Sequence, residues 1–345
     1  MTKKTRLSTS RRRFVQGTSA VAASTFFIRT AKADEFTADN PAIMKIATVA
    51  PPGTPWATQL RQVKKDIQNK SEGRIKVKTY LGGALGDEIA TAEATKRGTI
   101  QCFGGSAGAL ASAVPELNVI ELPFLFKNEK TADNILDNVI REDLDNLLWD
   151  RGFKLTFFSE NGYRSMGSTF PIETPADLSG KKMRSQESEV HLDTWRAFGA
   201  SPVPMAVTEV LSGLQTGVVD GFDNTPLFAF AASWYQAIGH WTETKHIYQP
   251  GIVVLSKKFY ESLPADLQEI VKGDIAKLSK KGRRGVRSIG PMLLDNFTNA
   301  GIPVTTLTDS QRAAFQGKAE QVWDKFHAAT TAEGKALLDK IKANI

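Results

Sequence analysis

NGYRSMGST (Asn161–Thr169) and GKKMRSQES (Gly180–Ser188) are the two segments on which the fold prediction depends. The second begins with a short strand that ends at Arg184 and precedes a helical pattern at Glu189–Phe198. Arg184 is therefore predicted at the carboxyl end of a strand, where open α/β sheets bind their ligands. A guanidinium group matches a carboxylate with two parallel hydrogen bonds, which a lysine does not. These segments predict an anion-binding lobe.

Two further strands are predicted after this helix, at Pro202–Met205 and at Val218–Asp220. The Met205–Thr208 turn and a loop at Phe222–Asn224 are then expected at the same edge of the sheet as Arg184. The same alternation of strands and helices precedes Asn161, which predicts a second parallel α/β lobe.

Pro115–Phe126 is expected as a loop beneath a core, and Ala265–Phe297 as one long helical stretch that is broken or kinked near Gly290 and Pro291. The chain is expected to cross between the lobes near Glu160 and near Gln249–Gly251. The predicted first lobe comprises residues 34–160 and 250–288, and the predicted second lobe comprises residues 161–249 and 289–345.

The positive charge of the chain is concentrated at its start. The sequence has 44 Lys and Arg against 37 Asp and Glu, but residues 1–33 contain eight of the basic residues and no acid, so the rest has 36 basic and 37 acidic residues. A near-neutral body argues against nucleic acid as a partner. SRRRFVQ (Ser10–Gln16) resembles a twin-arginine export signal, and Ala31–Ala33 fits a cleavage site. We expect cleavage after about Ala33 and export to the periplasm.

Cys102 is the only cysteine, so the chain forms no internal disulfide. No segment of the sequence is long and apolar enough to cross a bilayer. It also lacks metal-ligand clusters and phosphate-loop motifs, so neither a metal nor a cofactor is expected.

The chain resembles the solute-binding proteins of tripartite ATP-independent periplasmic (TRAP) transporters, of the DctP type, over residues 42–330. The likeness lies in the order and spacing of five segments: LGGALGDE, VPELNVIELPFLF, TPADLSGKKMR, GASPVPMAVTEVLSGLQTGVVDG with FDN after it, and FYESLPADLQ. It implies an α/β, two-lobed periplasmic binding protein (type II-like) with hinge strands and a long C-terminal helix that bridges the lobes.

The resemblance also implies a function and site residues. A member of this family captures an organic acid and passes it to sodium-coupled TRAP permease subunits in the membrane. Arg184 is then expected to bind the ligand carboxylate, with Arg164 as a second anion contact and Asn224 as a hydrogen-bonding partner. Val207 stands where many members have an aromatic residue, which leaves more room. His246 matches a position that is sometimes a ligand contact.

Four further residues are candidates for the wall of the cleft: Trp56 at a strand-to-helix junction, Phe222, Glu88 and Ser106. Three of these residues, and Arg184, have an ordinary structural alternative. Trp56 and Phe222 also fit a packed core, Glu88 also fits an exposed acid at a helix start, and Arg184 also fits a surface ion pair.

Two rival functions are weighed against the binding protein. GGSAG (Gly104–Gly108) matches the G-x-S-x-G pattern of a hydrolase, with Ser106 as nucleophile; no HGGG-type loop precedes it. A binding protein of an ATP-driven importer differs only in its membrane partner. The sequence leaves the acid open among C4-dicarboxylates, 2-oxo acids, sugar acids and aromatic acids, and we expect a monomer in preference to a dimer.

Overall fold

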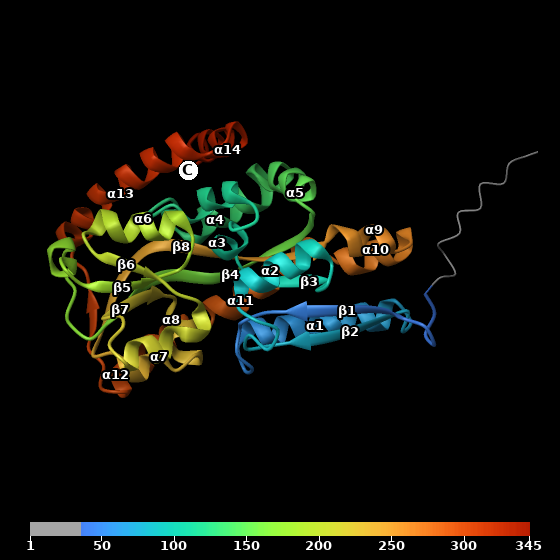
Figure 1. Cartoon of the computed structure of the whole chain (residues 1–345), viewed down its shortest axis with the longest axis horizontal. Helices are drawn as coiled ribbons and strands as arrows, with labels where there is room; N and C mark the ends of the chain where they lie inside the picture. The colour runs from blue at the N-terminus through green and yellow to red at the C-terminus, as the bar shows by residue number, and fades with distance from the viewer. Residues whose placement is uncertain (1–35) are drawn as a thin grey trace, which may run out of the picture.

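The computed structural model describes residues 36–345, and the predicted export signal lies outside them. A single nine-stranded sheet runs through this part of the chain in the order β2-β1-β3-β8-β4-β7-β5-β6, with β9 beside β8. Figure 1 shows two masses of helices at the ends of this sheet, joined by β4 and β8.

The first lobe holds three parallel strands and the helices between them. Its elements are β1 (Ala42–Ala47), α1 (Pro55–Lys70), β2 (Ile75–Tyr80), α2 (Glu88–Arg97), β3 (Cys102–Ser106), α3 (Ala107–Leu110), the 3₁₀ helix η1 (Pro115–Glu121), α4 (Glu129–Asn134), the π-helical turn η2 (Ile135–Val139) and α5 (Arg141–Asp150). Thr54 accepts a hydrogen bond from the Ala57 amide and caps α1, and Asp87 caps α2 in the same way. The residues of η1 are buried, so this segment is a packed 3₁₀ helix where a loop was expected.

The second lobe repeats the plan with shorter elements. They are the 3₁₀ helix η3 (Pro175–Leu178), β5 (Lys182–Ser185), α6 (Glu189–Phe198), β6 (Ser201–Pro204), the 3₁₀ turn η4 (Val207–Glu209), α7 (Val210–Gln215), β7 (Gly221–Asn224), α8 (Pro226–Ala231) and the 3₁₀ turn η5 (Trp234–Ala237). Strand β7 begins later than the predicted Val218–Asp220. Gly221 allows this because a Cβ there would lie 2.6 Å from the Gly167 carbonyl oxygen, too close for any other residue.

Strands β4 (Phe153–Ser168) and β8 (His240–Ser256) are antiparallel and pass through both lobes. Glu160 pairs with Pro250, so the two predicted crossing points lie side by side. The register of β4 shifts between Glu160 and Gly162 and again between Arg164 and Met166. Such bulges bend and twist a strand locally, which suits a hinge.

The C-terminal part crosses back over both lobes. Its elements are α9 (Lys257–Ser262), α10 (Ala265–Lys272), α11 (Ile275–Arg287), α12 (Gly290–Asn299), β9 (Val304–Thr306), α13 (Asp309–Ala329) and α14 (Ala332–Lys342). The stretch Ala265–Phe297 is three helices: the expected break near Gly290 separates α11 from α12, and Gly273, at a φ of 69°, adds a break between α10 and α11 that was not expected. Long α13 packs on α6 at one end and α14 at the other.

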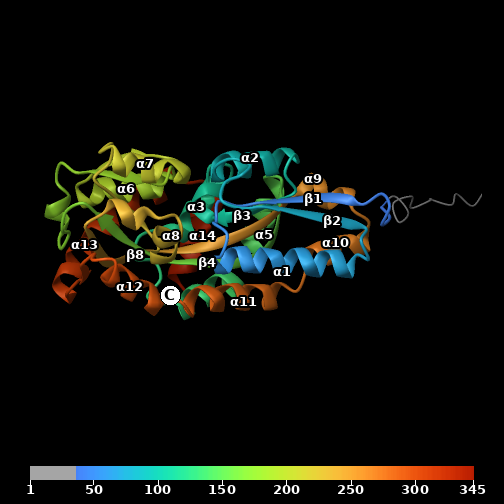
Figure 2. The same ribbon diagram turned by 90° about the horizontal axis from the view of Figure 1, so that it is seen from below.

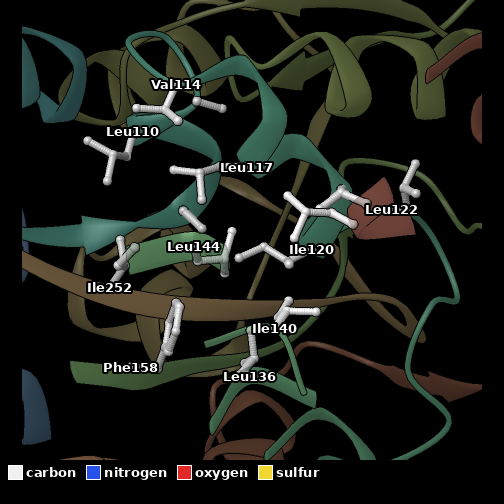
Figure 3. Close-up of a cluster of buried hydrophobic side chains, with 14 of the residues drawn as sticks. Leu110, Val114, Leu117, Ile120, Leu122, Leu136, Ile140, Leu144, Phe158 and Ile252 are labelled. Carbon is white, nitrogen blue, oxygen red and sulfur yellow. The ribbon is translucent and has the colours of Figure 1, made fainter. Parts of the chain in front are cut away.

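Helix α14 does not belong with the second lobe, where residues 289–345 were placed. Leu337, Leu338 and Ile341 are buried in the largest hydrophobic cluster, which is built mainly from first-lobe residues of α3, η1, η2, α5 and β4. Figure 3 shows the centre of this cluster, where Leu117 and Ile120 face Phe158 and Ile252. The apolar spacing of α14 predicts a buried face but does not say which core receives it, and this explains the error.

Candidate functional site

A polar cleft lies where the two lobes meet across the crossing strands. It contains about 600 Å³ of space free of protein atoms, including the solvent at its opening. Both lobes and the hinge contribute to its wall. Among the predicted site residues, it is lined by Trp56, Glu88, Ser106, Arg164, Arg184 and Asn224, together with Val207.

Arg184 lies one residue before the end of β5 and lines this cleft. The side chain is 2% exposed, and Nε and Nη2 donate to one acceptor, the Met205 carbonyl, at 3.0 and 2.7 Å. Within residues 36–345, Nη1 makes no hydrogen bond. Burial, and then the positive charge of Arg164, lower the pKa of Arg184 to about 10. Arg184 is thus a buried cation, still charged at neutral pH, without a carboxylate bonded to it.

Arg164 lies nearby but is fully engaged by the protein. Its Nε donates to Asp223 Oδ2 at 2.5 Å and its Nη2 donates to the Asp223 carbonyl at 2.6 Å. Nη1 donates to Gln249 Oε1 at 2.8 Å. Burial opposes ionisation of Asp223, but the charge of Arg164 and contacts from His191 and His246 hold its pKa well below the usual range. Arg164 and Asp223 therefore form a buried ion pair in the cleft wall.

Glu88 and Ser106 form the first-lobe wall. Ser106 donates to Glu88 through its amide at 2.8 Å and its hydroxyl at 2.9 Å, and Gln186 Nε2 donates to Ser106 Oγ across the cleft at 3.0 Å. Burial raises the pKa of Glu88, and the hydrogen bonds from Ser106 oppose this effect.

Glycine is required at two positions beside Ser106, because a side chain there would collide with this network. A Cβ at Gly105 would collide with Glu88 Oε1, and a Cβ at Gly108 would lie 2.6 Å from both Gln186 Nε2 and Glu121 Oε2. The hydroxyl of Ser106 is bonded to Glu88, Gln186 and the Ala109 amide, and to no histidine of residues 36–345. The G-x-S-x-G match therefore has a packing explanation and no catalytic partner.

Trp56 and Asn224 lie at the junction of the lobes. The indole Nε1 of Trp56 donates to the Glu160 carbonyl at 3.0 Å, and the ring covers Gly251 so closely that a Cβ there would collide with it. Asn224 ends β7, and its Oδ1 accepts from the Thr225 amide at 2.8 Å. Both side chains line the cleft.

Phe222 and His246 are not brought to the cleft. Phe222 is fully buried in the second-lobe core, 4.9 Å from the Trp234 ring and 6.3 Å from Trp241. His246 is buried with Nδ1 2.7 Å from Thr244 Oγ1 and Nε2 3.5 Å from Asp223 Oδ2. The predicted ligand contacts at these two positions are therefore not supported by their placement, because neither side chain lines the cavity.

Sequence reasoning missed two glutamines in the wall, Gln186 and Gln249. Gln186 follows Arg184 by two residues, so the period of a strand was a usable signal. Gln249 Nε2 donates to Gln186 Oε1 at 2.9 Å and to Glu121 Oε2 at 3.1 Å. No local pattern marks Gln249, because its partners come from other elements of the fold.

Residues 36–345 contain no group of three or more His, Cys, Asp or Glu side chains placed to hold a metal ion. None of their helices combines the length and apolar character that crossing a bilayer requires.

Two lobes joined by hinge strands, with a polar cleft between them, are the architecture of proteins that close around a small solute. The chain is such a binding protein. It belongs to the bacterial extracellular solute-binding proteins of family 7, whose model matches residues 46–330, and is thus a solute-binding protein of the TRAP type and not an enzyme.

Some of its relatives carry names that state what they bind. The chain is 34% identical to a solute-binding protein of Verminephrobacter eiseniae, over 68% of this chain and 74% of the relative. It is 29% identical to the 2,3-diketo-L-gulonate-binding periplasmic protein of Escherichia coli, over 75% of this chain and 79% of that protein. The crystal structure of the sugar acid binding protein of Advenella mimigardefordensis with galactonate superposes with a TM-score of 0.83 at 26% identity, over 88% and 99%.

Proposed function

We propose that this protein is exported to the periplasm, captures an organic acid through Arg184, and passes it to a sodium-coupled TRAP permease. The observation that carries the proposal is the state of Arg184. The hydrogen bonds of this buried guanidinium go to one carbonyl and none goes to a carboxylate, so a ligand carboxylate supplies charge-assisted hydrogen bonds that the protein does not. The names of the relatives, which bind organic acids, support the same class of ligand.

The charges of the cleft favour an acid with one carboxylate. Arg164 is neutralised by Asp223, so Arg184 is the cation left for the ligand. A second carboxylate would enter a wall that already contains the acid Glu88. The polar atoms of Glu88, Asn224 and Gln186 suit hydroxyl groups, and a hydroxylated monocarboxylate of the galactonate kind satisfies both requirements.

Binding is proposed to close the two lobes about the crossing strands. Trp56, Glu88 and Ser106 belong to the first lobe and Arg184 to the second, so one ligand contacts both only in the closed form. The ligand then stabilises closure by its greater affinity for that form.

The test is thermal unfolding of residues 34–345 with galactonate, glucuronate, 2,3-diketo-gulonate and succinate, and with galactose as a neutral control. A ligand at 100 times its dissociation constant stabilises the folded state by about 2.7 kcal/mol, which is a visible shift. The shift should be present for a hydroxylated monocarboxylate and lost in Arg184→Ala.

The matched control is Arg196→Ala, whose side chain is half exposed on α6 and outside the cleft. It should keep the response. A shift that survives in Arg184→Ala, or a shift with galactose alone, would reject the assignment of Arg184. A larger shift with succinate than with the hydroxy acids would reject the single-carboxylate argument.

A further inference from the structure

Three polar contacts join the segment after Arg184 to the first lobe. Gln186 Nε2 donates to Ser106 Oγ at 3.0 Å, and Ser188 Oγ donates to Asn118 Oδ1 at 2.6 Å. The third contact is made by His191, on the first turn of α6. Since the second-lobe partners all follow Arg184 within seven residues, the group that we assign to the ligand and the contacts between the lobes lie on one short segment.

The third contact contains ionisable groups. His191 Nε2 lies 2.6 Å from Glu121 Oε2, and both side chains are at most 1% exposed. Glu121 is held by the Gly108 amide at 2.6 Å and by Gln249 Nε2 at 3.1 Å. The other ring nitrogen, Nδ1, makes no hydrogen bond and lies 3.8 Å from Asp223 Oδ2. His191 is thus between a first-lobe carboxylate and a second-lobe carboxylate.

The remaining charged groups near His191 are accounted for. Arg164 on β4 is paired with Asp223, and His246 on β8 lies 3.5 Å from the same carboxylate. On α6 itself, Asp193 is paired with Arg196 and with Lys325 of α13. The buried group facing His191 is therefore Glu121, Asp223, Arg164 and the imidazole of His246.

The charge balance of this group depends on whether the lobes are closed. With Glu121, Asp223 and Arg164 ionised and His246 neutral, the closed form has a net charge of zero only when His191 is protonated. Burial lowers the pKa of His191, but Asp223 and Glu121 outweigh burial and raise it above the ordinary value. In an open form in which Glu121 moved away with the first lobe, the remaining pair of Asp223 and Arg164 would be balanced with a neutral His191.

We propose that His191 and Glu121 are positioning residues that couple closure of the cleft to the uptake of one proton, so that the closed form is favoured at lower pH. This inference rests on the proposed hinge closure. Because the pKa of His191 is higher in the closed form than in the open form, protonation of His191 favours closure fully at a pH below the open-form pKa. This contribution to closure is lost as the pH rises through the closed-form pKa. One proton changes the closed-to-open ratio by at most about tenfold per pH unit.

The test follows the distance between spin labels across the opening of the cleft. Ala90 on α2 and Ser212 on α7 are exposed, and Figure 2 shows both helices along the upper edge of that view, α2 in the first lobe and α7 in the second. Cysteines at these positions accept labels, whereas Cys102 is buried. The closed fraction of residues 34–345 is measured without ligand and with galactonate, at about pH 6.5 and about pH 8.5. The first pH equals the ordinary pKa of histidine, about 6.5, and the second lies above it.

We expect the closed-to-open ratio to fall at least about threefold between these pH values, within the limit for one proton. The fall should disappear in Glu121→Gln and in His191→Gln. His327→Gln, on the exposed face of α13, should keep the wild-type dependence. His246→Gln should also keep it, which separates the two buried histidines.

A closed fraction that does not change with pH, or that changes equally in Glu121→Gln, would overturn the inference. The outcome for the proposed function is read separately. If galactonate does not alter the label distances while the pH dependence persists, the ligand proposed for the cleft is wrong and the role of His191 stands. A response to galactonate without any pH dependence has the opposite meaning.

Discussion

Replacing Arg164 by methionine should destabilise the ligand-free protein strongly, because it leaves Asp223 as a buried charge without its partner. The structure shows what is lost: a hydrogen bond of 2.5 Å to the Asp223 carboxylate, one of 2.6 Å to its carbonyl and one of 2.8 Å to Gln249. The arginine is 1% exposed, so water does not replace these bonds. Removing one member of a buried pair costs about 3–5 kcal/mol.

The assay is urea unfolding of residues 34–345 without ligand, with the midpoint and slope compared at neutral pH. The double variant Arg164→Met with Asp223→Leu should recover much of the loss, since the unpaired charge is gone. Arg196→Met is the matched control. Its pair with Asp193 is 2.6 Å long, but the arginine side chain is 51% exposed, so the loss should be below about 1 kcal/mol.

The pH dependence of this loss has a defined sign. Arg164 lowers the pKa of Asp223 in the folded protein, so the pair stabilises the fold fully above the unfolded value of about 3.9 and less as the pH falls below it. The difference between wild type and Arg164→Met should shrink in acid. A loss below about 1 kcal/mol at neutral pH, with ligand affinity strongly reduced, would refute the structural role of Arg164 and restore it as a direct ligand contact.

Three further outcomes are expected. Burial raises the pKa of Glu88 above its ordinary 4.5, so Glu88→Gln should raise the urea midpoint of ligand-free unfolding at neutral pH. The gain should vanish once the pH falls below 4.5, and a lower midpoint at neutral pH would contradict this. Gly251→Ala forces a Cβ against Trp56 and should cost about 1–3 kcal/mol in urea unfolding with a change in tryptophan fluorescence, whereas Gly317→Ala, in open space on α13, should stabilise by about 0.5–1 kcal/mol. Burial raises the pKa of Cys102 to about 12, so a thiol reagent should label it only in urea, and fast labelling of the native protein would show that the first-lobe core opens.

Much of the fold was accessible from the sequence because it depends on local chemistry. Thr54 and Asp87 cap α1 and α2 through residue types that favour helix starts, and Arg184 lies in β5, one residue before its end at Ser185. The errors arose where the outcome depends on distant packing. Phe222 was a candidate for the cleft, but the pleat of β7 turns it into the second-lobe core.

The sequence by itself determined the order of strands and helices, the family, and the place of Arg184 at a strand end. These follow from periodicity, capping and motif spacing, which act over a few residues. Only the tertiary structure decided which cleft arginine lacks a carboxylate partner. Asp223 neutralises Arg164 from 59 residues away, and Glu121 meets His191 from 70 residues away. The first pair forms only once β4 and β7 lie side by side, and the second only when the lobes have met, because a salt bridge depends on distance in space and not along the chain.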